Sequence, residues 1–138
     1  MIEKFNNIYY LLIYIIHFVG IAIYSYQTIV GTRKFCEKFE IDETAFTMIR
    51  FVGAFMLGWV LMAIYVMFFR RNGVVGAGSF FNLVFVQNLM YLIFGIYTIY
   101  INKLGHTEKT NSEGVIAAGV LTILSAILTY GLADKIYI

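Results

Sequence analysis

The chain has 138 residues, of which 61% are apolar, 18% aromatic and only 13% charged. Soluble domains average about 45–50% apolar and about 25% charged residues, so this composition excludes an ordinary soluble globule. It also excludes a disordered chain, and a net charge of +2 excludes the basic surface of a nucleic-acid-binding protein. We therefore predict an all-α integral membrane protein. The expected fold is a bundle of four transmembrane helices, a single domain over residues 1–138 without a soluble domain.

The first predicted span covers about residues 8–30. It is uncharged and carries tyrosines near both ends, as an aromatic belt would. The apolar run is longer than the core of a signal peptide and no small-x-small cleavage site follows it, so we expect a retained span. Cys36, just beyond it, is the only cysteine, so no disulfide can form within the chain.

A polar loop of mixed charge separates this span from the second, which is predicted over about residues 46–69. Phe35 and Phe39 lie four residues apart and predict a short helix at the membrane surface. Asp42 is the predicted N-cap of the second span. Arg50 lies one turn inside that span, where its guanidinium can reach the headgroups.

Arg70 and Arg71 end the second span, and a short Gly-rich connection follows them. The third span is predicted over about residues 79–101, antiparallel to the second. After another polar loop, Ser112 and Glu113 begin the fourth span, about residues 114–132. Four spans place both termini on one side, together with Arg70 and Arg71. The numbers of lysines and arginines on the two sides of the membrane are nearly equal. Because Arg70 and Arg71 are concentrated in one short turn, we expect a multi-pass membrane protein with its termini in the cytoplasm.

Small residues at helical spacing predict where the spans pack closely, because close backbone approach drives helix association in a bilayer. The main interpretation is packing within the bundle, and the alternative is docking against a partner protein or a second copy. Proline is absent, which favours a static bundle over a transporter with broken helices. The packing candidates are Gly53 and Gly58 in the second span, and Gly114, Ala118, Thr122 and Ala126 in the fourth.

His17, near the middle of the first span, is the most informative polar residue, since an ionisable group at membrane depth suggests function. At helical spacing it shares one face with Tyr14 and Tyr24. Gln87 and Asn88 supply amides in the third span. An unpaired amide in hydrocarbon costs several kcal/mol, about 4–8 on the strictest scale, so interhelical hydrogen bonds are the first interpretation. The second is a pocket around His17, lined by all five residues, that binds the polar end of a quinone, sterol, lipid or pigment.

Other chemistry finds less support in the sequence. The second histidine, His106, lies in a loop, so two histidines cannot ligate a haem at membrane depth. No ligand spacing predicts a metal site. No acid–base or nucleophile pair is present, so we predict no catalytic residue and no enzyme. Proton antiport is not favoured, because the sequence offers no membrane-embedded carboxylate to carry the proton.

The segment MIRFVGAFMLGWVLM, Met48 to Met62, places an arginine one turn inside a span and follows it with a run rich in small residues and leucine. In this it resembles the DoxX-like small four-span membrane proteins, over about a third of the chain. The third span departs from that group, because Gln87 and Asn88 stand where many members carry a basic residue. The resemblance implies a four-span bundle, and in some members a partnership with membrane redox enzymes, but no catalytic residue is transferred.

Three functions follow as hypotheses. The first is a non-catalytic accessory subunit of a larger integral-membrane complex, and the second is a binder of a hydrophobic cofactor or lipid around His17. The third is a small oligomeric pore or transporter. The expected partners are membrane lipid and other integral membrane subunits or a second copy of the chain, and no nucleic acid.

Overall fold

Four long helices form the protein in a computed structural model, which describes residues 2–138. They are α1 (Ile8–Ile29), α3 (Phe46–Ile64), α4 (Gly78–Ile96) and α5 (Glu113–Gly131), and no strand occurs among the described residues. With their flanking turns, the helices give four segments long and apolar enough to cross a membrane: Ile8–Ile29, Glu43–Phe69, Gly78–Ile101 and Glu113–Gly131. The predicted four-helix fold is confirmed, with boundaries that differ by at most three residues, and the chain is a multi-pass membrane protein.

Short elements begin, connect and extend the long helices. They are the 3-10 turns η1 (Ile2–Phe5) and η2 (Glu43–Ala45), the short helices α2 (Thr32–Lys38) and α6 (Ala133–Ile136), and the π-helical turns η3 (Tyr65–Phe69) and η4 (Tyr97–Ile101). The side chain of Asn7 caps α1 by accepting hydrogen bonds from the backbone of Tyr9 and Tyr10. Asp42 accepts one from the backbone of Thr44, which confirms it as the cap at the start of the second span.

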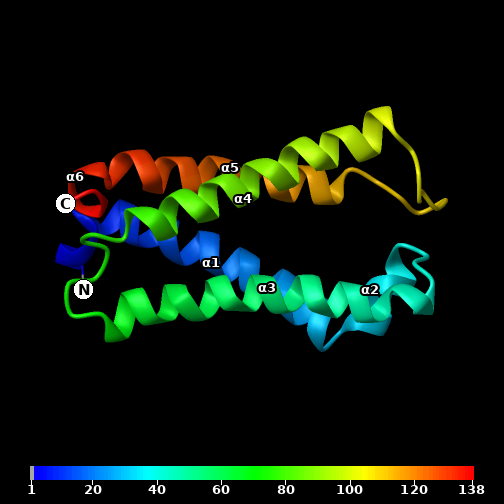
Figure 1. The fold of residues 1–138 in the computed structure, drawn as a ribbon, viewed down its shortest axis with the longest axis horizontal. Helices are drawn as coiled ribbons and strands as arrows, with labels where there is room; N and C mark the ends of the chain where they lie inside the picture. Colours follow the sequence, from blue (N-terminus) through cyan, green and yellow to red (C-terminus); the bar gives the residue numbers. More distant parts are fainter. Residues whose placement is uncertain (1) are drawn as a thin grey trace.

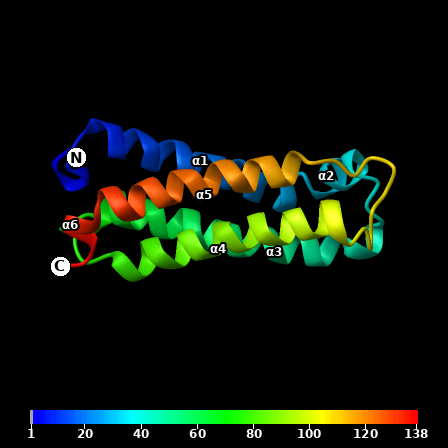
Figure 2. The ribbon, with the colours of Figure 1, turned by 90° about the horizontal axis from the view of Figure 1, so that it is seen from above.

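The helices associate as two pairs, α1 with α3 and α4 with α5, and α1 also packs against α5. Figure 1 shows the two pairs close together at the end that holds both termini and diverging toward the end that holds α2. Figure 2, seen from above, shows α5 running beside α1. Since α3 and α4 do not pack closely against one another, the bundle is wedge-shaped and wider at the α2 end.

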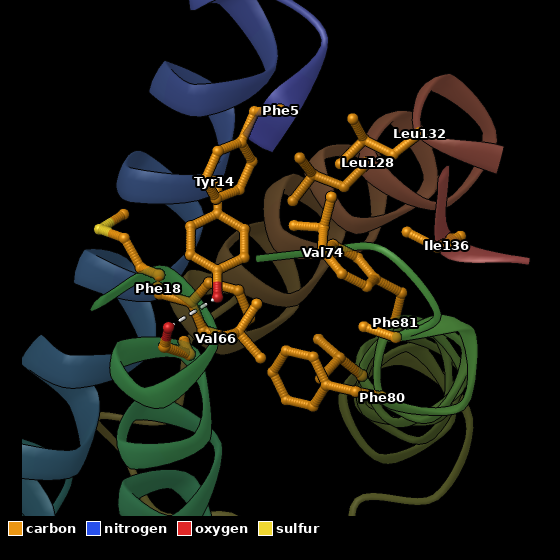
Figure 3. Packing of buried hydrophobic residues seen from close by; sticks show 14 of the residues in the cluster. Phe5, Tyr14, Phe18, Val66, Val74, Phe80, Phe81, Leu128, Leu132 and Ile136 are labelled. Atoms are coloured by element: carbon orange, nitrogen blue, oxygen red, sulfur yellow. Dashed lines mark hydrogen bonds between the residues drawn. The ribbon is translucent and has the colours of Figure 1, made fainter. Parts of the chain in front are cut away.

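Aromatic side chains fill the narrow, terminal end of the wedge (Figure 3). The rings of Phe5 and Phe18 lie 4.8 and 4.7 Å from that of Tyr14. The ring of Phe18 also stacks on Phe80 of α4, at 5.7 Å. This cluster joins the N-terminal turn, α1 and α4, and closes the bundle at that end.

Polar contacts also tie the terminal segments together. Lys4 Nζ donates to the backbone carbonyls of Met67 and Arg70, at 3.3 and 3.1 Å. These carbonyls lie at the C-terminal end of the second span, where a cation is favourable. Asn6 donates to the carboxylate of Asp134, at 2.8 Å, so the two ends of the chain meet.

Polar contacts between the two loop segments bridge the wide end of the wedge. Lys38 of α2 pairs with Glu113 at the start of α5, at 2.5 Å, and Lys109 pairs with Glu40 at 3.2 Å. Thr107 donates to the backbone carbonyl of Phe39, at 2.6 Å. Exposed ion pairs stabilise a fold by roughly 0–1 kcal/mol, so this end is held more weakly than the aromatic end.

Candidate functional site

A buried polar cluster joins three of the spanning helices at their centre. Asn88 of α4 places its amide nitrogen 2.9 Å from His17 Nε2 of α1. The same nitrogen lies 3.1 Å from Ser125 Oγ and 3.3 Å from the carbonyl oxygen of Leu121, both on α5. His17 is fully buried and Asn88 is 4% exposed. The interhelical hydrogen bond predicted between the third span and His17 is therefore present, and Asn88 makes it.

The hydrogen bonds of this cluster determine the tautomer of His17. The Leu121 carbonyl can only accept, so the Asn88 atom that faces it is the nitrogen and not the oxygen. Because this nitrogen donates to His17 Nε2, the Nε2 atom carries no proton. The histidine is therefore neutral, and its ring proton lies on Nδ1. His17 Nδ1 is the one fully enclosed side-chain nitrogen or oxygen without a hydrogen-bond partner within residues 2–138. The histidine is thus a structural acceptor for Asn88.

Two further hydrogen bonds link α1 to the backbone of α3. The Tyr14 hydroxyl donates to the carbonyl of Ala63, at 2.8 Å, as the dashed line in Figure 3 shows. The Ser25 hydroxyl donates to the carbonyl of Gly53, at 3.0 Å. The polar face of the first span therefore points into the bundle, where backbone carbonyls satisfy its hydroxyl groups.

A groove of about 370 Å³ lies inside the wide part of the wedge, next to this cluster. All four spanning helices contribute to its walls, which are mainly apolar. Its volume lies within the roughly 300–1,000 Å³ typical of sites for small molecules. The groove carries no charged side chain. The lining residues are Ile21, Tyr24, Met56, Trp59, Val84, Gln87, Asn88, Tyr91, Phe94, Gly95, Thr98, Ile99, Asn111, Gly114, Val115, Ala117, Ala118 and Leu121.

Only part of the predicted ligand site lines this groove. Tyr24, Gln87 and Asn88 do so. Tyr14 and His17 do not, so the groove is not centred on His17 as the predicted pocket is. The tyrosine belongs to the aromatic cluster, and the histidine lies behind Asn88. The groove lies farther toward the α2 end, and sequence reasoning missed most of its walls because they are ordinary apolar residues.

The predicted packing residues divide into two groups. A Cβ atom on Gly53 would lie 2.3 Å from Thr28 Oγ1, so this glycine permits the close approach of α1 and α3. Ala118 and Thr122 are buried and Ala126 is half-buried on α5. Their packing agrees with the predicted stripe.

Gly58 and Gly114 do not pack within the bundle, contrary to the main interpretation of the small residues. A Cβ atom at either position would meet no neighbouring atom within 4 Å. Gly114 lines the groove at the start of α5. Gly58 lies on the outer face of α3, in a shallow hollow lined also by Phe51, Ala54, Phe55, Trp59 and Met62.

Two titratable groups in the polar segment at the wide end have shifted pKa values. Burial raises the pKa of the Cys36 thiol above its usual value. Hydrogen bonds from Thr44 lower the pKa of the Asp42 carboxyl. No group of three or more His, Cys, Asp or Glu side chains in the described part of the chain is placed to hold a metal ion.

Comparison with known proteins gives no matching family model, no matching curated protein and no matching solved structure. The resemblance to DoxX-like proteins therefore stays a prediction, and the function is argued from the geometry of the groove.

Proposed function

We propose that the protein binds a small, uncharged, apolar molecule taken from the bilayer. The observation that carries this proposal is the groove of about 370 Å³ inside the wedge, with apolar walls and a few neutral polar groups. Sites for small molecules commonly combine such walls with a small number of placed polar side chains. Here Asn88, Gln87, Tyr91 and Tyr24 supply amide and phenol groups.

The fold supports lateral access to this groove. Because α3 and α4 lack close mutual packing, the side between them offers a path from the lipid. Trp59 of α3 lines the groove, and its ring centre lies 6.2 Å from that of Phe80 of α4. A membrane-soluble molecule could then enter without crossing the polar loops.

The experiment compares two glycine variants. Gly114→Leu adds a side chain at the wall of the groove, and Gly58→Leu makes the same change on the outer face of α3. At both positions a new Cβ atom meets no neighbouring atom within 4 Å. Each protein is extracted gently from its membrane and weighed intact by native mass spectrometry. We expect a bound mass of a few hundred daltons on the original protein and on Gly58→Leu, and its loss from Gly114→Leu. A bare chain in all three samples, or equal bound mass in all three, would contradict the proposal.

A second candidate is the accessory subunit of a larger membrane complex, which the outer hollow on α3 favours. Ala54 and Gly58 leave space there between Phe51, Phe55 and Met62, and another membrane helix could place a side chain in it. For this function Gly58→Leu should release a partner polypeptide while Gly114→Leu retains it. The same two variants therefore separate the two functions.

The termini are proposed to lie in the cytoplasm. Figure 1 places both termini at one end of the bundle, and that end carries four basic and two acidic side chains. The opposite end carries six of each, counting Arg50, whose guanidinium reaches Thr32 Oγ1 at 3.1 Å. Three of its six basic residues pair with acids, whereas Arg70 and Arg71 are concentrated in one short turn. Protease protection of a tag at the C-terminus in sealed vesicles tests this orientation.

A further inference from the structure

The carbonyl oxygen of Asn88 is the feature of the groove that most restricts its ligand. Asn88 is 4% exposed and lines the groove at the middle of the third span. Its amide nitrogen has all the partners that it can use: His17, Leu121 and Ser125. The donor half of this side chain is therefore committed to the bundle.

The acceptor half of the side chain is left free. Asn88 Oδ1 accepts no hydrogen bond from residues 2–138. It is not fully enclosed either, because His17 Nδ1 is the single fully enclosed unpaired side-chain atom of that range. The nitrogen faces α1 and α5, so the oxygen is the polar atom that Asn88 presents to the groove. Buried carbonyl groups normally have a partner, and a ligand can supply one here.

The nearby polar groups also present acceptors. Gln87 uses its amide nitrogen to donate to the Tyr91 hydroxyl, at 3.0 Å, and its carbonyl oxygen also lacks a partner among the described residues. Tyr91 is 38% exposed and also lines the groove. His17 Nε2 is engaged with Asn88 and does not reach the groove. At the depth of Asn88, the groove thus has two free carbonyl acceptors. Its walls also hold the hydroxyl groups of Tyr24 and Tyr91 and the indole of Trp59, which can donate.

We infer that the ligand is a neutral, membrane-soluble alcohol or phenol, whose hydroxyl group donates a hydrogen bond to Asn88 Oδ1 while its apolar body lies along α4 and α5. This inference rests on the proposed binding function and adds the chemistry of the ligand. A molecule whose only polar groups are carbonyls, such as a quinone, cannot donate a hydrogen bond to Asn88 Oδ1. A sterol, a long-chain alcohol and a quinol share the required hydroxyl group.

The position of Asn88 further excludes ligands with charged headgroups. It lies near the centre of the spanning segment Gly78–Ile101, far from both membrane surfaces. No charged side chain lines the groove, so a phosphate or ammonium group would be buried there without a counter-charge. From Asn88 to Ile99 the groove follows α4 for eleven residues, about 16 Å at 1.5 Å per residue. This length suits a rigid ring system or a short alkyl chain.

Matched pairs of probes test the inference. Each pair has one skeleton with and without the hydroxyl donor: cholesterol and its 3-methyl ether, hexadecanol and its methyl ether, and decylubiquinol and decylubiquinone. Trp59 is the only tryptophan of the chain and lines the groove, so its fluorescence reports binding to the full-length protein in nanodiscs. We expect the hydroxyl form to bind about tenfold more tightly, which corresponds to about 1.4 kcal/mol. The skeleton that binds best identifies the source of the hydroxyl group.

The outcomes separate the inference from the proposed function. Equal affinity for both members of every pair, with binding lost in Gly114→Leu and kept in Gly58→Leu, would overturn the inference and leave groove binding in place. Absence of binding by all six probes, or binding that Gly114→Leu does not change, would overturn both. Preference for the hydroxyl form, lost in Gly114→Leu, supports both.

A variant of Asn88 itself adds a second criterion. Asn88→Leu removes the carbonyl acceptor, and we expect the two members of each pair to bind with equal affinity. The comparison within a pair does not depend on the overall affinity of this variant. If Asn88→Leu fails to fold, the probe pairs on the unaltered protein still decide the question. If it folds and keeps the tenfold preference, the assignment of Asn88 as the acceptor is wrong.

Discussion

The pair Gly53 and Gly58 offers the sharpest test of the helix packing. Both glycines lie on α3, and both are packing candidates that the sequence indicates. A Cβ atom on Gly53 would lie 2.3 Å from Thr28 Oγ1 and 2.7 Å from Ile29 Cγ1 of α1, whereas one on Gly58 would meet nothing within 4 Å. Thr28 cannot easily move aside, because its hydroxyl donates to the carbonyls of Tyr24 and Ser25.

Alanine at each position separates helix propensity from packing. Replacing Gly by Ala in a helix gains about 0.8–1.0 kcal/mol of intrinsic propensity, and this gain is common to both variants. Overpacking a close contact costs about 1–3 kcal/mol, and only Gly53→Ala carries this cost. We therefore expect Gly58→Ala to be the more stable of the two variants by about 1–3 kcal/mol, the overpacking term alone.

The assay is reversible unfolding in mixed micelles, in which SDS is added to protein in a mild detergent. Circular dichroism reports the loss of helix, and the fluorescence of Trp59 reports the separation of the spans. Surface substitutions usually change stability by less than about 0.5 kcal/mol. If the two variants differ by no more than that amount, α1 and α3 do not approach each other at Gly53 as the structure shows.

Three further predictions concern the buried cluster and the wide end of the bundle. His17→Leu should destabilise the fold less than Asn88→Leu in the same unfolding assay. His17→Leu loses one membrane-buried hydrogen bond, which is worth about 0.6 kcal/mol on average. Asn88→Leu leaves a buried imidazole without its partner, which costs about 1–3 kcal/mol. Hydrogen bonds from Thr44 lower the pKa of the Asp42 carboxyl in the folded protein. The stability that this cap contributes is therefore present above the unfolded pKa, about 3.9, and is lost as the pH falls through the lowered folded value. Asp42→Asn should remove this pH dependence from unfolding curves measured between pH 7 and 3. Burial raises the pKa of the Cys36 thiol and encloses it, so maleimide should label the native protein far more slowly than the SDS-unfolded protein, and equal rates would contradict its burial.

Sequence alone predicted the fold well because the membrane imposes a length and a composition on each span. Four apolar runs separated by polar loops leave one architecture, and the predicted boundaries lie within three residues of the helices. The short surface helix was predicted from the spacing of Phe35 and Phe39, whose rings lie 5.2 Å apart in the structure. The cap at Asp42 was predicted from its residue type and its place before an apolar run.

The candidate site was predicted less well, because helical spacing tells which residues share a face but not which neighbour that face meets. Gly53 and Gly58 are five residues apart, so they point in different directions, and only Gly53 faces α1. His17 and Tyr14 were correctly placed on the inner face of α1. The hydrogen bond between His17 and the third span was also predicted, but the one from Tyr14 to a backbone carbonyl of α3 was not. No local pattern reveals such a carbonyl.

The groove itself follows from an imbalance between the two ends of the bundle. Large rings at the terminal end, from Phe5, Tyr14, Phe18 and Phe80, pack the helices together there. The wide end has small residues on α5 and only loop contacts between the two helix pairs. Apolar burial does not draw helices together inside a bilayer, so little drives the wide end to close. The protein thereby keeps an apolar space at membrane depth, and Asn88, held by its donor hydrogen bonds, is the neutral polar group placed to select what fills it.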